Sequence, residues 1–317
     1  MSRPRALVSA SRGIGDILRI TPLVAVCARL GYEVDLLLAT DYPDVVRLFE
    51  GALDLRRVFH VASPWRGSVN PVVPGLDREQ YDVATFTFWS RSLSPQVRAT
   101  RVLSFTQAEW LRNGDTTSVR AIARQLGWSG PLPPAFAVPS SRRFDLEPGT
   151  VALHPGCKPD WPWKKWHGFD ELAGLMPHVV LVGAPGDLDN ARTYFNRSFA
   201  WPAGVKNFIG ALDLPDTAAL IAQSSALVAN DSGLMHLGVA LGVPTLGIFG
   251  ITSPAREAMA ATNMFAVTKG LPCEAACRQG PWGRRDCEHH LKCLRTLTAE
   301  EVACRLDAIV RAPAWTT

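Results

Sequence analysis

The chain has 317 residues, of which 47% are hydrophobic and 20% charged, and its net charge at pH 7 is +4. This length favours two domains, and the mild positive charge argues against a nucleic-acid partner while allowing an anionic substrate. No stretch approaches the roughly 18 apolar residues of a membrane span, and the N-terminal residues lack a signal-peptide core. We therefore expect a cytoplasmic protein without a transmembrane segment.

Strands and helices alternate along the first half of the chain. Residues 5–10 are predicted to form a strand, and a Gly-rich turn leads from it into a helix that Pro22 should kink or restart, because proline removes a backbone hydrogen bond. The other predicted elements are strands at 33–39, 57–61 and 81–88, helices at 42–49 and 116–126, and a loop at 63–77. Such alternation is typical of a doubly wound parallel sheet.

The alternation begins again after a Pro-rich stretch at 127–139, which is the predicted linker. Strands are expected at 151–154, 179–182, 226–229 and 243–249, and helices at 169–176, 187–195, 215–224 and 297–310, with another after residue 232. The predicted fold class is therefore α/β, with two Rossmann-like doubly wound domains at 1–139 and 140–317.

The stretch 226–256 is the most informative part of the sequence. Its first strand ends at Asn230-Asp231-Ser232-Gly233, and leucines at helical spacing follow. In a parallel sheet this places a helix N-terminus at the carboxyl edge, where backbone N–H groups and the helix dipole favour an anion such as a diphosphate. Asp231 or Ser232 could simply cap the helix, but a cap does not account for His236 one turn further on.

The run D-S-G-L-x-H-L-x-x-A-L-G-V-P-T-x-x-x-F-G-x-T-x-P, which starts at Asp231, resembles the donor-nucleotide motif of glycosyltransferase family 9, the ADP-heptose heptosyltransferases. G-I-G-D-x5-P at residues 13–22 is similar to the N-terminal signature of that family. The resemblance implies a GT-B architecture with an acceptor-binding N-terminal domain, a C-terminal domain that binds the nucleotide-sugar, and an active site in the cleft between them. It also implies that Asp16 is the general base and that Gly15 belongs to the donor site, although Asp16 could equally flank the helix start.

Further donor-binding residues follow from the same resemblance. W-K-K-W at residues 163–166 is similar to the family's K-x-W-P element, whose lysine contacts the donor phosphates, so this role is expected of Lys164. A solvated basic loop is the alternative, and because His167 replaces the proline, Lys165 could take over the contact. Asp187 opens a predicted helix where the family often has a glutamate that helps to bind the nucleoside. The residues that align with family positions at the diphosphate and sugar are Asp231, Ser232, Gly233 and His236.

The segment 273–293 is rich in cysteine. Its four cysteines are spaced C-x3-C-x9-C-x5-C and are Cys273, Cys277, Cys287 and Cys293. Sulfur ligands at such spacing suit a tetrahedral zinc or iron site, although none of the spacings is the common C-x2-C, and reduced cysteines in a loop are the alternative. The resemblance implies that a metal here would be structural, because in this family the transfer itself requires no cofactor.

The resemblance implies an inverting glycosyltransferase that moves a heptose-like sugar from ADP-heptose to a hydroxyl of the lipopolysaccharide core, a lipid-linked glycan, a natural product or a protein. Such an enzyme is expected in the cytoplasm, where it could associate peripherally with the inner membrane. Two alternatives stay open. One is a nucleotide-sugar epimerase with the same diphosphate site. The other is a catalytically inactive relative that serves as a cysteine-metal assembly module, against which the retained Gly15-Asp16 and Asp231-Ser232-Gly233 argue.

Overall fold

The computed structural model describes residues 3–63, 71–189, 197–277 and 287–311, and within these ranges it leaves out the side chains of residues 111–115 and 275–277. The chain divides into two compact units, Met1–Val138 and Pro139–Thr317. The division falls within the Pro-rich stretch, where residues 128–139 belong to no helix or strand. Among the described residues, no helix combines the length and the apolar character that crossing a bilayer requires.

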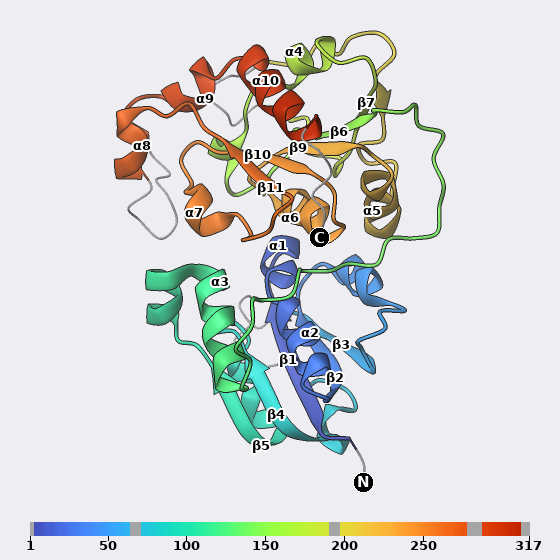
Figure 1. Ribbon diagram of the computed structural model, residues 1–317, viewed down its shortest axis with the longest axis vertical. Coiled ribbons are helices and arrows are strands. Elements are labelled where there is room, and N and C mark those ends of the chain that lie inside the picture. The colour runs from blue at the N-terminus through green and yellow to red at the C-terminus, as the bar shows by residue number, and fades with distance from the viewer. Residues whose placement is uncertain (1–2, 64–70, 190–196, 278–286, 312–317) are drawn as a thin grey trace. The chain divides into compact units, whose positions relative to one another are not determined.

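The first unit is built on a parallel sheet of five described strands (Figure 1). They are β1 (Arg5–Ser11), β2 (Glu33–Ala39), β3 (Arg57–Val61), β4 (Gln80–Phe86) and β5 (Arg98–Ser104), in the order β3-β2-β1-β4-β5. The central strand β1 is almost entirely buried, as its apolar run predicts. Chain order reverses between β1 and β4, and the carboxyl ends of strands at such a reversal are where α/β sheets bind ligands.

Local sequence signals explain where the helices of the first unit begin. α1 (Ile14–Leu18) follows the Gly-rich turn, and α2 (Pro22–Arg29) starts at Pro22, because a proline in the first turn of a helix removes no helical hydrogen bond. The predicted restart at Pro22 is therefore confirmed. α3 (Gln107–Gln125) begins well before the predicted start at residue 116, because Thr106 and Glu109 form a capping box. Short 3-10 helices are η1 (Pro43–Phe49), η3 (Leu76–Arg78) and η4 (Arg91–Gln96).

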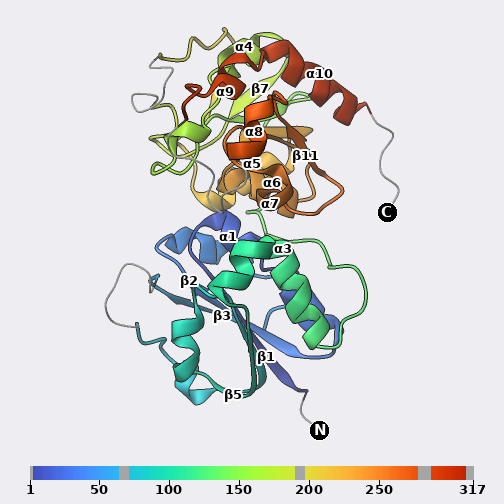
Figure 2. The same cartoon turned by 90° about the vertical axis from the view of Figure 1, so that its left-hand side faces the viewer.

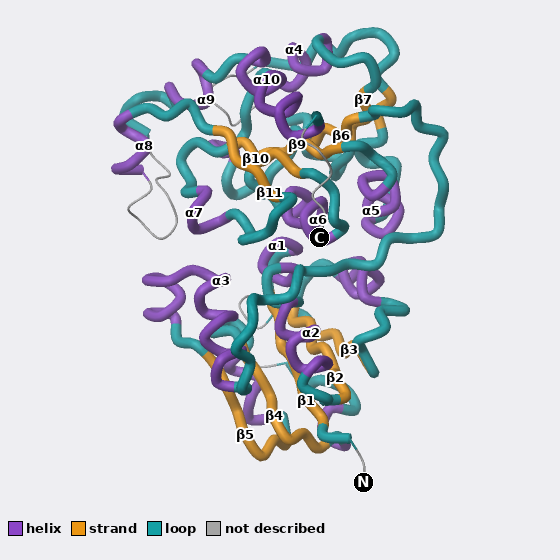
Figure 3. Tube along the Cα trace, viewed as in Figure 1, coloured by secondary structure: helices purple, strands orange, loops and turns teal. Residues whose placement is uncertain are grey.

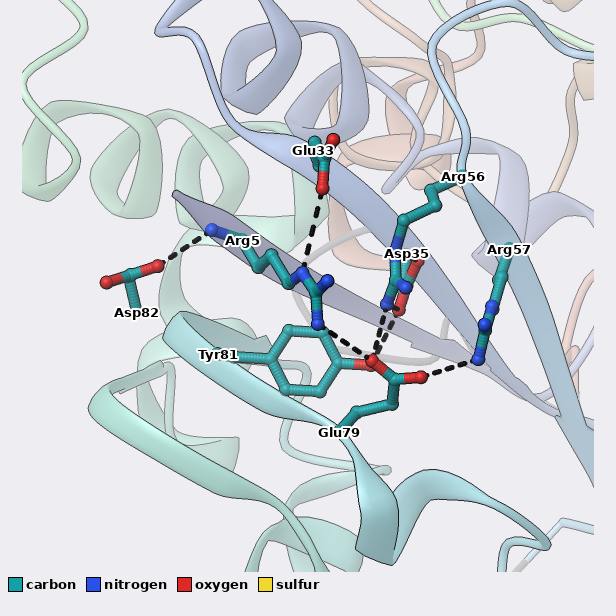
Figure 4. Close-up of polar contacts among 8 residues, drawn as sticks. All are labelled: Arg5, Glu33, Asp35, Arg56, Arg57, Glu79, Tyr81 and Asp82. Carbon is teal, nitrogen blue, oxygen red and sulfur yellow. Dashed lines mark hydrogen bonds and ion pairs between the residues drawn. The ribbon is translucent and has the colours of Figure 1, made fainter. Parts of the chain in front are cut away.

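Charged side chains gather around two buried carboxylates at the amino edge of the first sheet (Figure 4). The Asp35 carboxylate, fully buried in β2, accepts hydrogen bonds from Arg56 Nε (2.9 Å) and from the Tyr81 hydroxyl (2.7 Å). Arg56 also donates to Glu79 (2.8 Å), which forms a second ion pair with Arg57. These five residues, here called the amino-edge network, link the beginnings of β2, β3 and β4. Because both carboxylates have charged partners, their burial is compensated.

The second unit has a parallel sheet of six described strands. They are β6 (Val151–His154), β7 (Val179–Leu181), β8 (Lys206–Asn207), β9 (Ala226–Asn230), β10 (Thr245–Ile248) and β11 (Met264–Val267), in the order β11-β10-β9-β6-β7-β8. Every residue of β6 and β9 is buried. The predicted class, α/β with two parallel-sheet domains, is confirmed. The helix predicted at 187–195 is wrong where it can be compared, because residues 185–188 form a turn, and residues 190–195 lie outside the described ranges.

Helices cover both faces of the second sheet. α4 (Phe169–Gly174) and α10 (Ala299–Val310) lie together on one face, whereas α5 (Leu214–Ala222) and α6 (Gly233–Ala240) lie on the other, as two views show (Figures 1 and 2). Loops, drawn in teal in Figure 3, join the strands to these helices. The shorter helices are η5 (Pro162–Lys164), α7 (Pro254–Glu257), α8 (Pro272–Cys277) and α9 (Lys292–Thr296). The core includes the fully buried Trp166, whose indole Nε1 donates to the carbonyl of Leu297 just before α10 (2.9 Å).

Candidate active site

The turn between β9 and α6 places three polar residues at the carboxyl edge of the second sheet. Asn230 ends β9, is fully buried, and donates through Nδ2 to the carbonyl of Pro155 (2.8 Å). Asp231 is 5% exposed. Ser232 has an extended backbone and its hydroxyl accepts from the N–H of Met235 (3.4 Å), so it is the N-cap of α6. Asp231 is therefore not needed as a cap.

The partly buried Lys164 and the buried Asp231 form an ion pair, with 2.7 Å between Nζ and Oδ2. Burial lowers the pKa of Lys164, but the carboxylates of Asp231 and Glu257 outweigh it and leave this pKa above its ordinary value. Burial raises the pKa of Asp231, but the Lys164 ammonium outweighs it and leaves this pKa below its ordinary value. Both groups therefore stay charged near neutral pH, and a cation lies beside a helix N-terminus, a combination that suits a phosphate.

Two more buried polar residues adjoin the Asp231 carboxylate. They are His236, on α6, and Thr252, which follows β10; each is at most 5% exposed. After burial and Lys164, they are further influences on the pKa of Asp231, and both lower it. The structure thus gathers the predicted residues Lys164, Asp231 and His236 around the N-terminus of α6, whose first residue is Gly233. Their contacts with a donor stay predictions.

Lys165 makes a different set of contacts. Its ammonium donates to the backbone carbonyls of Asp187 (2.9 Å) and Asp189, and the residue is only 5% exposed. Both carbonyls belong to the turn that follows β7. These contacts give no support to the expectation that Lys165 replaces Lys164 at the phosphates.

The carboxylate of Asp187 folds back on its own turn, where Oδ2 accepts from the N–H of Ala184 (2.6 Å). The carboxylate has room there because the two residues packed against it, Gly156 and Gly183, have no side chain. A Cβ on Gly156 would lie 2.0 Å from Asp187 Cγ, and a Cβ on Gly183 would lie 2.5 Å from Oδ2. The side chain of Asp187 therefore holds the turn in shape, while its expected contact with the nucleoside stays a prediction.

Asp16 lies in α1, at the carboxyl edge of the first sheet. Its Oδ1 accepts from Arg19 Nη2 (2.9 Å) and its Oδ2 from the N–H of Gly13 (3.2 Å), while its side chain is 30% exposed. Gly15, directly before it, is buried. Because each carboxylate oxygen has two lone pairs, both contacts leave room for a further donor such as an acceptor hydroxyl. The geometry suits a base and equally suits a carboxylate that stabilises the helix start.

Sequence patterns did not single out Arg12 and Trp89, which meet at the same edge. Arg12 has φ of 80°, a left-handed conformation that is uncommon outside glycine, and its guanidinium carbon lies 3.8 Å from the centroid of a Trp89 ring. Trp89 follows β4. This strand lies next to β1, at the point of the first sheet where the chain order reverses. The position of Trp89, an aromatic residue shortly after a strand, was the signal available in the sequence. Its contact with Arg12 could not be predicted from sequence spacing.

The described part of the cysteine-rich segment does not form a metal site. Cys287 and Cys293 are buried, Cys273 is partly buried, and the side chain of Cys277 lies outside the described residues. Burial raises the pKa of Cys293 to about 12, with smaller contributions from Glu274 and the other two described thiols. No three described His, Cys, Asp or Glu side chains are grouped so that they could hold a metal ion. The expected zinc or iron is therefore not supported by the side chains that can be compared.

Two parallel-sheet α/β units, the second with a cation at a strand-to-helix turn, agree with the architecture of GT-B glycosyltransferases. Residues 134–281 match the family model described as glycosyltransferase family 9 (heptosyltransferase). This match covers just under half of the chain, and it confirms the resemblance to glycosyltransferase family 9 that was drawn from the motifs.

Individual relatives agree with this assignment. The chain is 32% identical over 204 residues to lipopolysaccharide heptosyltransferase 1 of Pseudomonas aeruginosa, a match that covers 58% of this chain and 56% of the relative. Its match therefore spans about half the length of that protein. Two solved structures from Escherichia coli share the fold. ADP-heptose lps heptosyltransferase II has a TM-score of 0.68 at 18% identity, covering 96% of this chain and 98% of that one. Heptosyltransferase WaaC with ADP has a TM-score of 0.66 at 19% identity, covering 96% and 99%.

Proposed function

We propose that this protein is an inverting glycosyltransferase that moves a heptose-like sugar from an ADP-sugar to an acceptor hydroxyl. The observation that supports it most directly is the ion pair of Lys164 with the buried Asp231 at the N-terminus of α6. This pair lies inside the segment that matches the family. A charged lysine and the first N–H groups of a helix are suited to oppose the charge that develops on a departing diphosphate.

In the proposed reaction, the acceptor oxygen forms a bond to the anomeric carbon while the bond from that carbon to the diphosphate oxygen breaks. The diphosphate leaves with the bonding electrons, and the proton of the acceptor hydroxyl passes to Asp16. Arg19 and the N–H of Gly13 hold the Asp16 carboxylate in one orientation. Positioning matters here because a sugar hydroxyl becomes acidic only as its new bond forms.

The donor and the acceptor are proposed from different observations. An ADP-sugar donor is supported by the shared fold with a heptosyltransferase whose structure contains ADP, and the lipopolysaccharide core is supported as the acceptor by the name of the relative from P. aeruginosa. The second unit would then bind the donor and the first the acceptor, with the protein working in the cytoplasm and at the inner membrane surface. Any metal held by the cysteines would be structural in this proposal.

A panel of sugar nucleotides tests the proposal. Purified protein is incubated with ADP-heptose, UDP-glucose and GDP-mannose, each with and without a heptose-deficient lipopolysaccharide, and release of the nucleoside diphosphate is measured. We expect acceptor-dependent release of ADP alone. Calorimetry with ADP and UDP gives a second readout, and failure to bind any nucleotide would instead favour an inactive relative.

Asp16→Asn tests the assignment of the base. The amide keeps the shape of the side chain but cannot take a proton, so turnover should fall by about 10²- to 10⁴-fold, the usual contribution of a general base. The affinity for ADP should be unchanged. A variant with near-normal turnover would remove Asp16 from the mechanism.

A further inference from the structure

Lys165 is a buried lysine whose observed partners are backbone carbonyls. It is 5% exposed, and its ammonium donates to the carbonyls of Asp187 and Asp189. A buried ammonium is stable only when its N–H groups have acceptors. The two carbonyls accept from two of its three N–H groups, and they belong to one short turn. Lys165 therefore ties its own loop to the turn after β7.

The neighbours of Lys165 contact a different part of the second unit. Lys164 pairs with Asp231 (2.7 Å), and the N–H of Trp166 donates to Oδ1 of Asn230 (3.0 Å). Asn230 and Asp231 are consecutive at the end of β9. The loop from Lys164 to Trp166 thus joins the β9–α6 turn on one hand and the turn after β7 on the other.

Backbone geometry explains why the contacts alternate. Lys165 has φ of −71° and ψ of 127°, an extended conformation. Lys164 is the last residue of the 3-10 helix η5, so the backbone changes conformation between the two lysines and their side chains leave it in different directions. Lys164 and Lys165 therefore cannot exchange partners unless the loop changes conformation, although both are lysines.

We propose that Lys165 is a positioning residue of the donor site, which fixes the loop so that Lys164 faces the N-terminus of α6, and that it does not bind the donor phosphates itself. The inference rests on the proposed function, because it assigns a role within the proposed donor site. Its rival is that Lys165 is a second, direct phosphate ligand.

A double-mutant cycle separates these two roles. Calorimetry measures the affinity for ADP of the full chain and of the variants Lys164→Met, Lys165→Met and the double variant. If Lys165 acts through Lys164, its substitution weakens ADP binding by about tenfold, in the range found when a supporting residue is removed. In the Lys164→Met background the same substitution should then weaken binding less than about twofold, because residues that act through one contact are not additive. Equal losses in both backgrounds would overturn the proposal.

Lys165→Gln provides a second arm with less risk to folding. The glutamine amide can still donate to a carbonyl but carries no charge. A positioning role predicts that Lys165→Gln keeps ADP affinity within about threefold, since the hydrogen bond to the turn is what matters. A phosphate ligand would lose as much affinity with glutamine as with methionine, and this result would also overturn the proposal.

Amide hydrogen exchange without any nucleotide tests the tie directly. Lys165→Met should speed exchange of the N–H groups of Ala184 and Asp187 by about tenfold or more, because the turn loses an anchor, whereas Lys164→Met should not. Lys206→Met is a matched control. Lys206 lies on β8, an outer strand of the same sheet, and its ammonium also donates to a backbone carbonyl, that of Asp145 (2.9 Å). It should alter neither ADP affinity nor exchange in this turn. Unchanged exchange in Lys165→Met would contradict the tie.

These readouts also separate the inference from the function it depends on. If the wild-type protein binds ADP, and Lys165→Met weakens ADP binding equally with and without Lys164, only the role of Lys165 is wrong. If the wild-type protein binds no nucleoside diphosphate, the proposed function fails and the role of Lys165 in a donor site fails with it.

Discussion

The two units bury charged side chains at opposite edges of their sheets. In the first unit the amino-edge network joins Asp35, Arg56 and Glu79 where the strands begin (Figure 4). In the second unit Lys164 and Asp231 meet where the strands end. Parallel α/β sheets bind ligands at their carboxyl edges. We therefore infer that the first group of charges stabilises the sheet, whereas the second is available for recognition.

The two units also use different cations, an arginine in the amino-edge network and a lysine beside Asp231. Arg56 uses its planar fork to contact Asp35 and Glu79 together, a geometry that fixes both partners. Lys164 is a compact charge on a flexible stem and can move from one anion to another. An arginine thus lies where the partner is permanent, and a lysine lies where a phosphate could compete with Asp231.

The largest expected effect comes from breaking the amino-edge network. Asp35→Ala leaves Arg56 and the Tyr81 hydroxyl without their buried acceptor, so the free energy of unfolding should fall by about 3 kcal/mol or more. Urea unfolding measures this, and ADP affinity of the folded variant should not change. Asp82→Ala is the control, because Asp82 accepts an exposed hydrogen bond from the N–H of Arg5 and its loss should cost less than about 1 kcal/mol. A loss of that smaller size for Asp35→Ala would remove the contrast.

Glu79 should make the stability of the protein depend on pH. The hydrogen bond from Arg56, followed by the charges of Arg57 and Arg5, holds the pKa of Glu79 below its ordinary value despite burial. The stabilisation is therefore complete above an ordinary glutamate pKa of about 4.3 and is lost as the pH falls through the lowered pKa of the folded state. Glu79→Gln should be less stable at neutral pH by about 1 to 2 kcal/mol, since it loses charged hydrogen bonds.

Urea midpoints at neutral and acidic pH check this prediction. The wild-type protein should lose more stability on acidification than Glu79→Gln does, because the variant has no carboxylate to protonate at this position. Equal losses would mean that Glu79 does not contribute to acid sensitivity.

A smaller effect is expected when the second unit's carboxylate is neutralised. Asp231→Asn keeps the shape of the side chain but frees the Lys164 charge, so ADP should bind about three to ten times more tightly, equivalent to roughly 1 kcal/mol of charge interaction. Calorimetry measures the change, and Asp35→Asn should leave ADP affinity as it is. Weaker ADP binding by Asp231→Asn would show that this carboxylate organises the site rather than competing for the lysine.

The smallest expected effect concerns the helix cap. Ser232→Ala removes the hydroxyl that accepts from the N–H of Met235. N-cap serines contribute about 0.5 to 2 kcal/mol, and the 3.4 Å distance places this one near 0.5. Thermal melting should therefore shift only slightly. A loss as large as that of Asp35→Ala would mean that the carboxyl edge also determines stability.

Elements with strong local signals could be predicted from the sequence. The break before Pro22 follows from the chemistry of proline, and the buried strand β9 with its Ser232 cap follows from an apolar run ending in Asp-Ser-Gly. β5 was missed because its sequence, R-A-T-R-V-L-S, is a largely exposed outer strand without a regular apolar pattern. β11 was missed because its four apolar residues, M-F-A-V, are too short a run to distinguish a strand from other structure.

The candidate site was predictable in its parts but not in its pairings. Motif spacing pointed to Lys164 and Asp231 separately, yet their contact depends on the path of the loop after β6. The different partners of Lys165 depend on one extended residue within that loop. The stacking of Arg12 on Trp89 joins residues after different strands, and no sequence period records such a contact.

The indole N–H of Trp166 donates a hydrogen bond to the carbonyl of Leu297, shortly before the last described helix. The side chain beside the two lysines is thus bonded to the segment that leads into α10. Shortening the protein before α10, or fusing a bulky partner there, should disturb the loop from Lys164 to Trp166 through this contact. Nucleotide affinity should accordingly be measured on protein that retains α10.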